Sequence, residues 1–202
     1  MADKKIFVHE TSIIDNGVVI GQGTKIWCFC HFLKNTTVGK NCTFGQNCVV
    51  GANVKIGNGV KAQNNVSIYE GVEIEDDVFL GPSMVFTNVI NPRSFIERKD
   101  EFKKTLIRQG ASIGASVTVI CGVTIGRYAF IGAASLITKD VPDFALVYGS
   151  PAKQHGWVGI SGNKIEFDKS GIAKDPTDGT EYILKNGVVS LTDPETLSKQ
   201  NY

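Results

Sequence analysis

The chain has 202 residues, a formal net charge of +1 and a hydrophobic content of 42%. This length suits one domain with at most a small appendage, and the balanced charge predicts binding to neither nucleic acid nor membrane. No apolar run approaches the roughly 20 residues that span a bilayer, and the first ten residues, MADKKIFVHE, lack the apolar centre of a signal peptide.

The cysteines are odd in number and lack paired CxxC spacing, which argues against both a disulfide framework and a zinc site. Reduced thiols are typical of a cytoplasmic protein, and we expect that location and no bound metal. The five are Cys28, Cys30, Cys42, Cys48 and Cys121.

An apolar residue recurs at every sixth position, first over residues 8–86 and then, on a shifted phase, over residues 107–137. All twenty of these positions are apolar, whereas composition alone predicts about eight. They are Val8, Ile14, Ile20, Ile26, Phe32, Val38, Phe44, Val50, Ile56, Ala62, Ile68, Ile74, Leu80, Phe86, Ile107, Ile113, Val119, Ile125, Ile131 and Ile137.

Two other positions of each hexad are also restricted. The residue after the apolar one is glycine in nine of the twenty hexads, which we attribute to a sharp bend or unusual φ/ψ angles at a corner. Four residues after the apolar one, nineteen hexads have a small or β-branched residue, and only Met84 is larger. Cys30, Cys42 and Cys48 occupy this position and are predicted to be small core residues.

A period of six matches neither an α-helix nor a single strand, but it matches a short strand followed by a turn. Three such units close a triangular coil of about 18 residues, and stacked coils pair as parallel ladders about 4.8 Å apart. We therefore predict an all-β fold, a parallel β-helix of about seven triangular coils over residues 1–156.

The repeat stops at FTNVINPR, residues 86–93. The next segment, PRSFIERKDEFKKTL (residues 92–106), shifts the phase by three and must leave the prism as a protruding loop. One interpretation is a solvated excursion with a short helix over residues 96–105. The other is a binding loop on a rigid scaffold, in which arginine binds a phosphate or carboxylate.

The corner glycine is replaced in some hexads just before this loop, for example by Gln63, Tyr69 and Glu75. Positions where a regular rule fails are expected to be functional or strained. Tyr69 is therefore a candidate substrate contact, and surface packing between subunits is the alternative interpretation.

The hexad pattern of residues 8–142 resembles that of the hexapeptide-repeat acyltransferases. The resemblance implies a left-handed β-helix, opposite in hand to the usual parallel crossover. It also implies a homotrimer with active sites between neighbouring prisms.

In many sugar and antibiotic acetyltransferases of this fold, a histidine just before a proline at the loop entrance takes a proton from the acceptor. The corresponding places here hold Asn88 and Asn91-Pro92, and asparagine cannot act as a base. An amine acceptor with a pKa of roughly 8 is already partly neutral near pH 7 and needs no such base. We therefore predict an amine acceptor held by Asn88, for which a turn residue with positive φ is the alternative.

The run EDDVFLGPSMVFTNVINPRS, with ERKDEF and GASIGASVTVICGVTIGRYAFIGAASLITKDVPDFALVYGSPAKQHGW, is similar to bacterial UDP-2-acetamido-3-amino-2,3-dideoxyglucuronate N-acetyltransferases. These enzymes use acetyl-CoA to make a sugar for lipopolysaccharide, O-antigen or capsule. The resemblance implies that Asn88 is catalytic. It also implies that the UDP or carboxylate of the sugar is met by residues among Asn91, Arg93, Arg98 and Lys99.

The same resemblance places coenzyme A along the last coils. It implies contacts to the backbone at Gly132 and Ala134 and to the phosphates at Lys139 and Lys153. Two solvated lysines are the alternative interpretation of the last pair.

Residues 157–202 lack the hexad and are expected to form a small appendage. Within them, YILKNGVVSL carries an Asn186-Gly187 pair between two apolar runs, which predicts a two-residue β-hairpin.

Three other functions are alternatives to N-acetylation of the UDP-linked sugar. A zinc-dependent carbonic anhydrase of the same fold would need three convergent histidines, but His9, His31 and His155 are far apart in sequence. Acetylation of a dTDP-linked 3-amino-3,6-dideoxyhexose changes only the sugar, although such relatives usually keep the histidine. A non-enzymatic β-helix, such as an ice-binding scaffold, would need a flat ladder of threonines that this sequence lacks.

Overall fold

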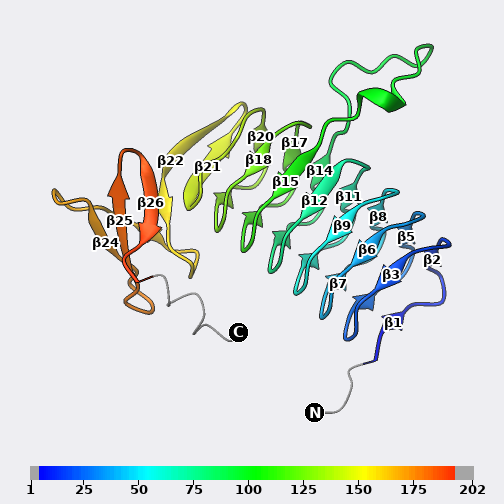
Figure 1. Cartoon of the computed structure of the whole chain (residues 1–202), viewed down its shortest axis with the longest axis horizontal. Helices are drawn as coiled ribbons and strands as arrows, with labels where there is room; N and C mark the ends of the chain where they lie inside the picture. Colours follow the sequence, from blue (N-terminus) through cyan, green and yellow to red (C-terminus); the bar gives the residue numbers. More distant parts are fainter. Residues whose placement is uncertain (1–4, 194–202) are drawn as a thin grey trace.

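The computed structural model describes residues 5–193, and its regular elements are almost all short β-strands joined by turns. Twenty of them, β1 to β20, stack as three parallel sheets that form the three faces of a prism (Figure 1). A smaller unit of antiparallel strands follows the prism at the C-terminal side. The predicted all-β prism is confirmed.

The first face contains β1 (Phe7–Val8), β4 (Lys25–Ile26), β7 (Thr43–Phe44), β10 (Lys61–Ala62), β13 (Phe79–Leu80), β16 (Ser112–Ile113) and β19 (Phe130–Ile131). The second contains β2 (Ile13–Ile14), β5 (His31–Phe32), β8 (Val49–Val50), β11 (Ser67–Ile68), β14 (Val85–Phe86), β17 (Thr118–Val119) and β20 (Leu136–Ile137). The third contains β3 (Val19–Ile20), β6 (Thr37–Val38), β9 (Lys55–Ile56), β12 (Val72–Ile74), β15 (Thr105–Ile107) and β18 (Thr124–Ile125).

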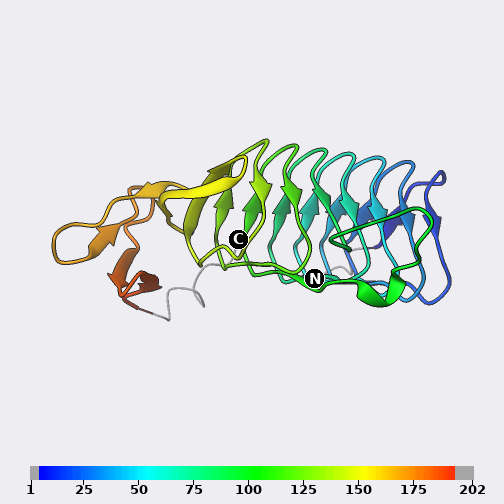
Figure 2. The ribbon, with the colours of Figure 1, turned by 90° about the horizontal axis from the view of Figure 1, so that it is seen from above.

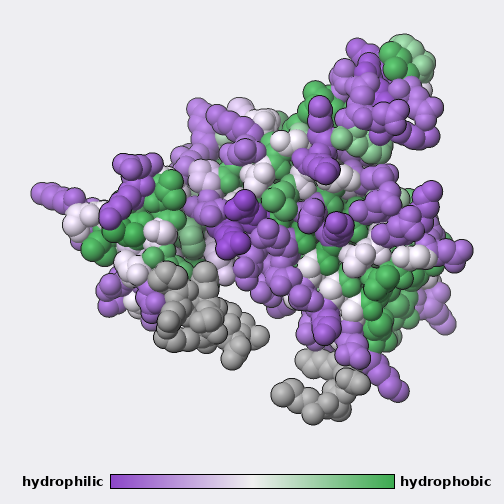
Figure 3. Space-filling model, in the orientation of Figure 1, coloured by the Kyte–Doolittle hydropathy of each residue, from purple (hydrophilic) through white to green (hydrophobic). Residues whose placement is uncertain are grey.

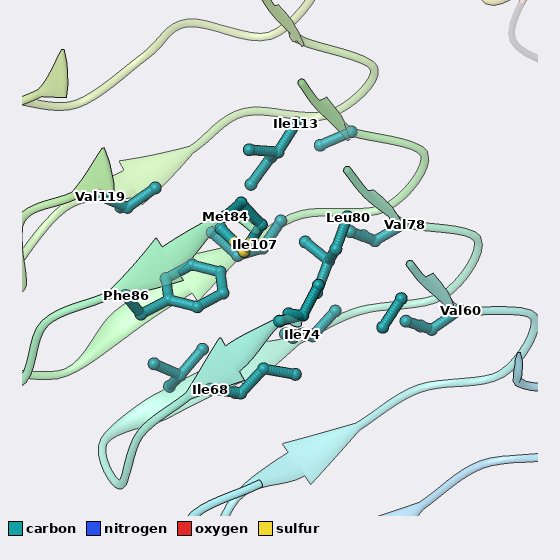
Figure 4. Packing of buried hydrophobic residues seen from close by; sticks show 14 of the residues in the cluster. Val60, Ile68, Ile74, Val78, Leu80, Met84, Phe86, Ile107, Ile113 and Val119 are labelled. Carbon is teal, nitrogen blue, oxygen red and sulfur yellow. The ribbon is translucent and has the colours of Figure 1, made fainter. Parts of the chain in front are cut away.

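Each of the twenty apolar positions is the last residue of its strand. From Ile26 onward, all of these side chains point into the prism and are at most 4% exposed. Figure 4 shows Ile68, Phe86 and Val119, from successive rungs of the second face, stacked along the core. The first coil is the open end of the stack, so Val8 remains 36% exposed.

The small position of the hexad satisfies backbone groups inside the prism. Thr24 Oγ1 donates to the Gly39 carbonyl at 2.9 Å and accepts from the Cys42 amide at 3.0 Å, which links two coils. Cys30 Sγ and Cys48 Sγ each donate to a corner carbonyl of the next coil in the same way. These cysteines and Cys42 are buried free thiols, as predicted, and burial raises the pKa of the Cys42 thiol.

None of the corner glycines has a positive φ, so a left-handed backbone does not explain them. Gly114 is not among the residues with positive φ. A Cβ on Gly114 would lie 2.6 Å from the Ala133 amide nitrogen of the next coil. Glycine is therefore needed at this position because neighbouring coils approach closely there.

The left-handed conformation occurs instead two residues later in the hexad. Asn35, Asn41, Asn47, Asn53 and Asn65 all occupy this position and have φ between 55° and 61°. Asparagine tolerates this conformation better than most residues, which explains its recurrence there. The recurrence of asparagine at this position is visible in the sequence and could have predicted the left-handed residue of each turn.

The arm, residues 87–104, leaves the prism between β14 and β15 and is drawn in green in Figures 1 and 2. Thr105 and Leu106, which were predicted to lie in the loop, belong to β15. The helix expected over residues 96–105 is only a single 3-10 turn, η1 (Lys99–Glu101). Its short length reflects the lack of any buried side chain that would hold a longer helix against the prism.

Beyond the prism, β21 (Ala145–Gly149) adds a parallel rung to the first face and pairs antiparallel with β22 (Ala152–Val158). β23 (Lys164–Ile165) follows β22, and β24 (Ile172–Lys174), β25 (Glu181–Lys185) and β26 (Val188–Leu191) form a separate sheet.

The predicted hairpin of the appendage is confirmed. Lys185 pairs with Val188, and the two turn residues Asn186 and Gly187 have φ of 52° and 76°. The last nine residues of the predicted 157–202 appendage lie outside the described residues.

The close approach of the coils yields a stability prediction. Gly114→Ala should lower the free energy of unfolding by about 3 kcal/mol, because the new methyl group meets backbone that cannot move aside. Gly162→Ala is the control, since its φ of +85° is strained but nothing lies within 4 Å. It should cost about 1 kcal/mol. If urea denaturation showed that both variants lose the same free energy of unfolding, the close approach of the coils would not explain the glycine at residue 114.

Candidate functional site

The base of the arm is closed by a hydrogen bond between its two ends. The Lys103 amide donates to the Asn88 carbonyl at 2.9 Å, and we call these two residues the neck. Beside the neck, the Cys121 amide of the next coil donates to Thr87 Oγ1 at 2.9 Å. The half-buried side chain of Asn88 forms no hydrogen bond within residues 5–193, so its amide group is available to a ligand.

The arm contains a hollow of about 500 Å³ lined by three of the predicted substrate-binding residues, Asn91, Arg93 and Arg98. Arg98 is held in place because its Nη1 donates to both carboxylate oxygens of Glu101, at 2.7 and 3.0 Å. Its Nε is buried and has no hydrogen-bond partner among the described residues. A buried donor without a partner is costly. The two arginines that line the hollow make it a candidate anion site.

Lys99 does not line this hollow. Its ammonium lies 2.8 Å from Glu97 Oε1, and both side chains are more than 70% exposed. Hydrogen bonding within this pair raises the pKa of Lys99 and lowers the pKa of Glu97. Such an exposed pair contributes little to stability. The structure therefore separates Lys99 from the other three arm residues.

The predicted site residues fall on two different corners of the prism. Tyr69, Asn88 and Lys139 lie one or two residues after strands of the second face, β11, β14 and β20, and so line one corner. Two rungs separate β14 from β20, which is about 10 Å along the prism. Gly132 and Ala134 follow β19 of the first face and lie at another corner, with the second face between the two.

Lys139 and Lys153 line one hollow of about 390 Å³ at the C-terminal end of the prism. One wall is the turn after β20, residues 138–142, and the other is the start of β22. Both lysines are exposed, and neither forms an ion pair within residues 5–193. The two predicted cations therefore share a hollow in which an anionic group can bind.

The backbone at Gly132 and Ala134 is largely committed to the fold. The Gly132 amide donates to the Val147 carbonyl, and the Ala134 amide donates to the Ala115 carbonyl, both at 2.8 Å. Ala134 has a φ of 58°, which places it in the left-handed region. Any contact between a ligand and this backbone must therefore use carbonyl oxygens rather than these amides, and the Gly132 carbonyl already accepts a hydrogen bond from Ser135 Oγ at 2.6 Å.

A further hollow, of about 490 Å³, lies on the third face and was not predicted. Its lining is mixed in charge, with Lys55 and Arg127 facing Glu73, Glu75 and Asp76. The Glu75 carboxylate accepts a hydrogen bond from the backbone amide of Gln109 at 2.9 Å. Residue 75 therefore has a side-chain role that the usual corner glycine could not fill. The sequence shows that Glu75 replaces a corner glycine, but only the structure shows that it lines a hollow on the third face.

None of the three histidines lies beside the neck. His31 belongs to β5, three rungs before β14, and its Nε2 lies 3.0 Å from Asp15 Oδ1. His9 lies in the first coil and contacts Thr11, and His155 lies on β22. Within one chain, no imidazole therefore lies beside the neck.

Figure 3 shows hydrophobic side chains gathered at the N-terminal end of the prism. In the first two coils, Ile13, Val19 and Phe29 are all more than half exposed. In the described part of the chain, no helix is long and apolar enough to cross a membrane. Residues 5–193 also contain no group of three or more histidine, cysteine or acidic residues placed to hold a metal ion.

Two models of known protein families match the N-terminal part of the prism. Residues 8–52 match the model "Bacterial transferase hexapeptide (six repeats)", and residues 35–70 match "Hexapeptide repeat of succinyl-transferase". Residues 8–70, just under a third of the chain, thus match models of the hexapeptide repeat. The same period of six continues through the rest of the prism.

Solved structures share the fold of this hexapeptide-repeat prism, the left-handed β-helix. A hexapeptide transferase family protein from Anaplasma phagocytophilum matches 79% of the chain and 87% of its own length, with a TM-score of 0.55 and 18% identity. A variant of GDP-perosamine N-acetyltransferase from Caulobacter crescentus, solved with CoA and GDP-perosamine, matches 76% of the chain and 58% of its own, with a TM-score of 0.54 and 19% identity. At these identities the likeness establishes the fold.

Curated relatives match parts of the hexapeptide-repeat chain. A dTDP-3-amino-3,6-dideoxy-alpha-D-galactopyranose 3-N-acetyltransferase from Aneurinibacillus thermoaerophilus is 40% identical over 92 residues, covering 45% of this chain and 46% of its own. A galactoside O-acetyltransferase from Lactococcus lactis is 33% identical over 106 residues, covering 48% and 51%. The chain thus spans about half the length of the curated relatives it matches.

Proposed function

We propose that the protein is an acetyl-CoA-dependent N-acetyltransferase that acts on a nucleotide-linked amino sugar. The observation that carries this proposal is the 40% identity to an enzyme named as a 3-N-acetyltransferase of a dTDP-linked 3-amino sugar. The fold is also that of a GDP-perosamine N-acetyltransferase solved with CoA.

Our first candidate for the acceptor is the 3-amino group of UDP-2-acetamido-3-amino-2,3-dideoxyglucuronic acid. The arginine-lined hollow of the arm supports a substrate with a carboxylate, because Arg98 lines it and its guanidinium is held in place by Glu101. A dTDP-linked 3-amino-3,6-dideoxyhexose is the second candidate, favoured by the named relative. The second sugar has no carboxylate to offer to this hollow.

The proposed chemistry needs no protein base. An amine with a pKa of roughly 8 is about one-tenth neutral at pH 7, and that fraction attacks the thioester carbonyl carbon. The tetrahedral intermediate collapses as the C–S bond breaks, and the departing thiolate takes up the proton that the nitrogen loses. Asn88 would orient the amine at the neck, where its side chain is free of other hydrogen bonds.

The acetyl donor would lie along the last coils. Lys139 and Lys153, which share one hollow, would bind phosphates of acetyl-CoA, while the carbonyl side of Gly132 and Ala134 would meet its chain. Because Asn88 and Ala134 lie at different corners, one prism alone does not bring them together. We therefore propose a homotrimer in which neighbouring subunits complete each site.

Replacing Asn88 tests the catalytic assignment. Asn88→Ala should reduce kcat about 100-fold, which is typical for loss of one orienting or stabilising donor. Urea denaturation should be unchanged, because the side chain makes no hydrogen bond within residues 5–193. His31→Ala is the control and should retain kcat. Thiol release from acetyl-CoA reports both, and full turnover by Asn88→Ala would remove this residue from the mechanism.

A panel of UDP- and dTDP-linked 3-amino sugars, with and without a carboxylate, tests the substrate. Arg98→Met should lower kcat/KM for the carboxylated sugar about tenfold to 100-fold, the range expected for a charged hydrogen bond. Sugars without the carboxylate should lose much less. Lys99 lies outside the hollow, so Lys99→Met should leave kcat/KM unchanged for both kinds of sugar.

Glu101→Gln controls for the shape of the arm in that experiment. It removes the ion pair of Arg98 but keeps the guanidinium. An equal loss in Glu101→Gln and Arg98→Met, for all sugars alike, would contradict a direct contact between Arg98 and the carboxylate. Turnover of only dTDP sugars by the unmodified protein would select the second candidate.

A further inference from the structure

Two exposed aromatic rings are stacked on each other beside the last coil. The centroids of Tyr148 and His155 lie 3.6 Å apart, and the rings are inclined by only 7°. Tyr148 is 44% exposed, and His155 is also exposed. Nothing in the proposed chemistry uses this pair.

A β-bulge brings the two rings together. In the β21–β22 ladder, Leu146 pairs with Gly156 but Val147 pairs with Gln154, so His155 has no partner on the opposite strand. A bulge re-aims the side chain of the extra residue, and here that ring lies over Tyr148. Bulges are frequent beside binding sites for this reason.

Tyr148 is itself fixed against the prism. A Cβ on Gly132 would lie 2.8 Å from Tyr148 Cβ, so only glycine at residue 132 allows this approach. The Gly132 amide also donates to the carbonyl of Val147, the neighbour of Tyr148, at 2.8 Å. The stack is therefore built on a rigid coil.

A cation lies next to the stack. Lys153 is the cross-strand partner of Tyr148, and directly opposite residues of an antiparallel pair project to the same face. Lys153 also lines the hollow that contains Lys139. A flat aromatic surface is thus adjacent to lysines that have no ion-pair partner within residues 5–193.

We propose that the Tyr148–His155 stack receives the adenine ring of coenzyme A while Lys153 binds an adjoining phosphate. This inference rests on the proposed function, because it names the part of the acetyl donor that meets this surface. A base stacks on an aromatic side chain through its π-face, and the phosphates attached to the same nucleoside need neighbouring cations. The rings act in binding and positioning and take no part in the chemical step.

The test compares two acetyl donors that differ only beyond the pantetheine phosphate. Tyr148→Leu and His155→Leu should each weaken CoA binding about tenfold in calorimetry and raise KM for acetyl-CoA to match. KM for acetyl-phosphopantetheine, which lacks the adenosine 3′,5′-bisphosphate part, should not change. The kcat for acetyl-CoA and KM for the amino sugar should also stay constant.

Two matched variants separate stacking from folding. His155→Phe keeps a ring in the bulge and should restore most of the CoA affinity that His155→Leu loses. Phe79→Leu removes an aromatic ring of similar exposure on β13 and should leave CoA binding unchanged.

The outcomes distinguish this inference from the function on which it rests. If the unmodified protein binds CoA and the leucine variants bind it equally well, the adenine assignment is wrong and the function stands. The adenine assignment is also wrong, and the function stands, if the leucine variants lose affinity equally for acetyl-CoA and for acetyl-phosphopantetheine. If the unmodified protein does not bind CoA at all, the proposed function fails and this assignment fails with it.

Discussion

The hydrogen bonds between successive coils are the constraint on which the rest of the structure depends. Each strand pairs with the strand one coil later, so that Lys25 lies opposite Thr43 and Lys61 opposite Phe79. Because all three faces keep this pairing, inward side chains of the same hexad position stack directly above one another. The core, the small buried position and the close corner glycines are three consequences of one ladder spacing of about 4.8 Å.

The arm interrupts the sequence without interrupting this ladder. Ser67 pairs with Val85 at a separation of 18 residues, whereas Val85 pairs with Thr118 at a separation of 33. The extra fifteen residues are all placed outside the prism, and the next rung forms as if they were absent. A rigid scaffold can thus carry an irregular segment, and both the neck and the arginine-lined hollow belong to that segment.

The fold was predictable because each coil repeats the same physical problem. Ile68 and Phe86 occupy the same place in successive hexads, and the pattern that buries one also buries the other. The Asn186-Gly187 hairpin was predictable because its turn needs two positive φ angles. The close approach at Gly114 depends on a neighbouring coil, which a local reading of glycine as a flexible residue misses.

The candidate site was less accessible from the sequence. Nothing local places Arg98 in the hollow and Lys99 outside it, because those positions depend on ion pairs formed by the folded arm. The bulge that brings His155 over Tyr148 is a mismatch between two strands, and neither strand shows it alone. Sites that depend on such pairings require the structure.

Removing the arm tests the central claim that a self-sufficient prism carries the acceptor site on a separate segment. Deleting residues 90–104 joins Val89 to Thr105 and restores the six-residue period between Phe86 and Ile107. In the shortened chain, residue 89 takes the left-handed position of the hexad, which valine disfavours, so the deletion is combined with Val89→Asn. Acetyl-CoA binding and sugar acetylation would be measured on this chain. The account predicts a folded protein that binds CoA as before and transfers no acetyl group to the sugar. Loss of the fold or of CoA binding, or continued transfer, would contradict it.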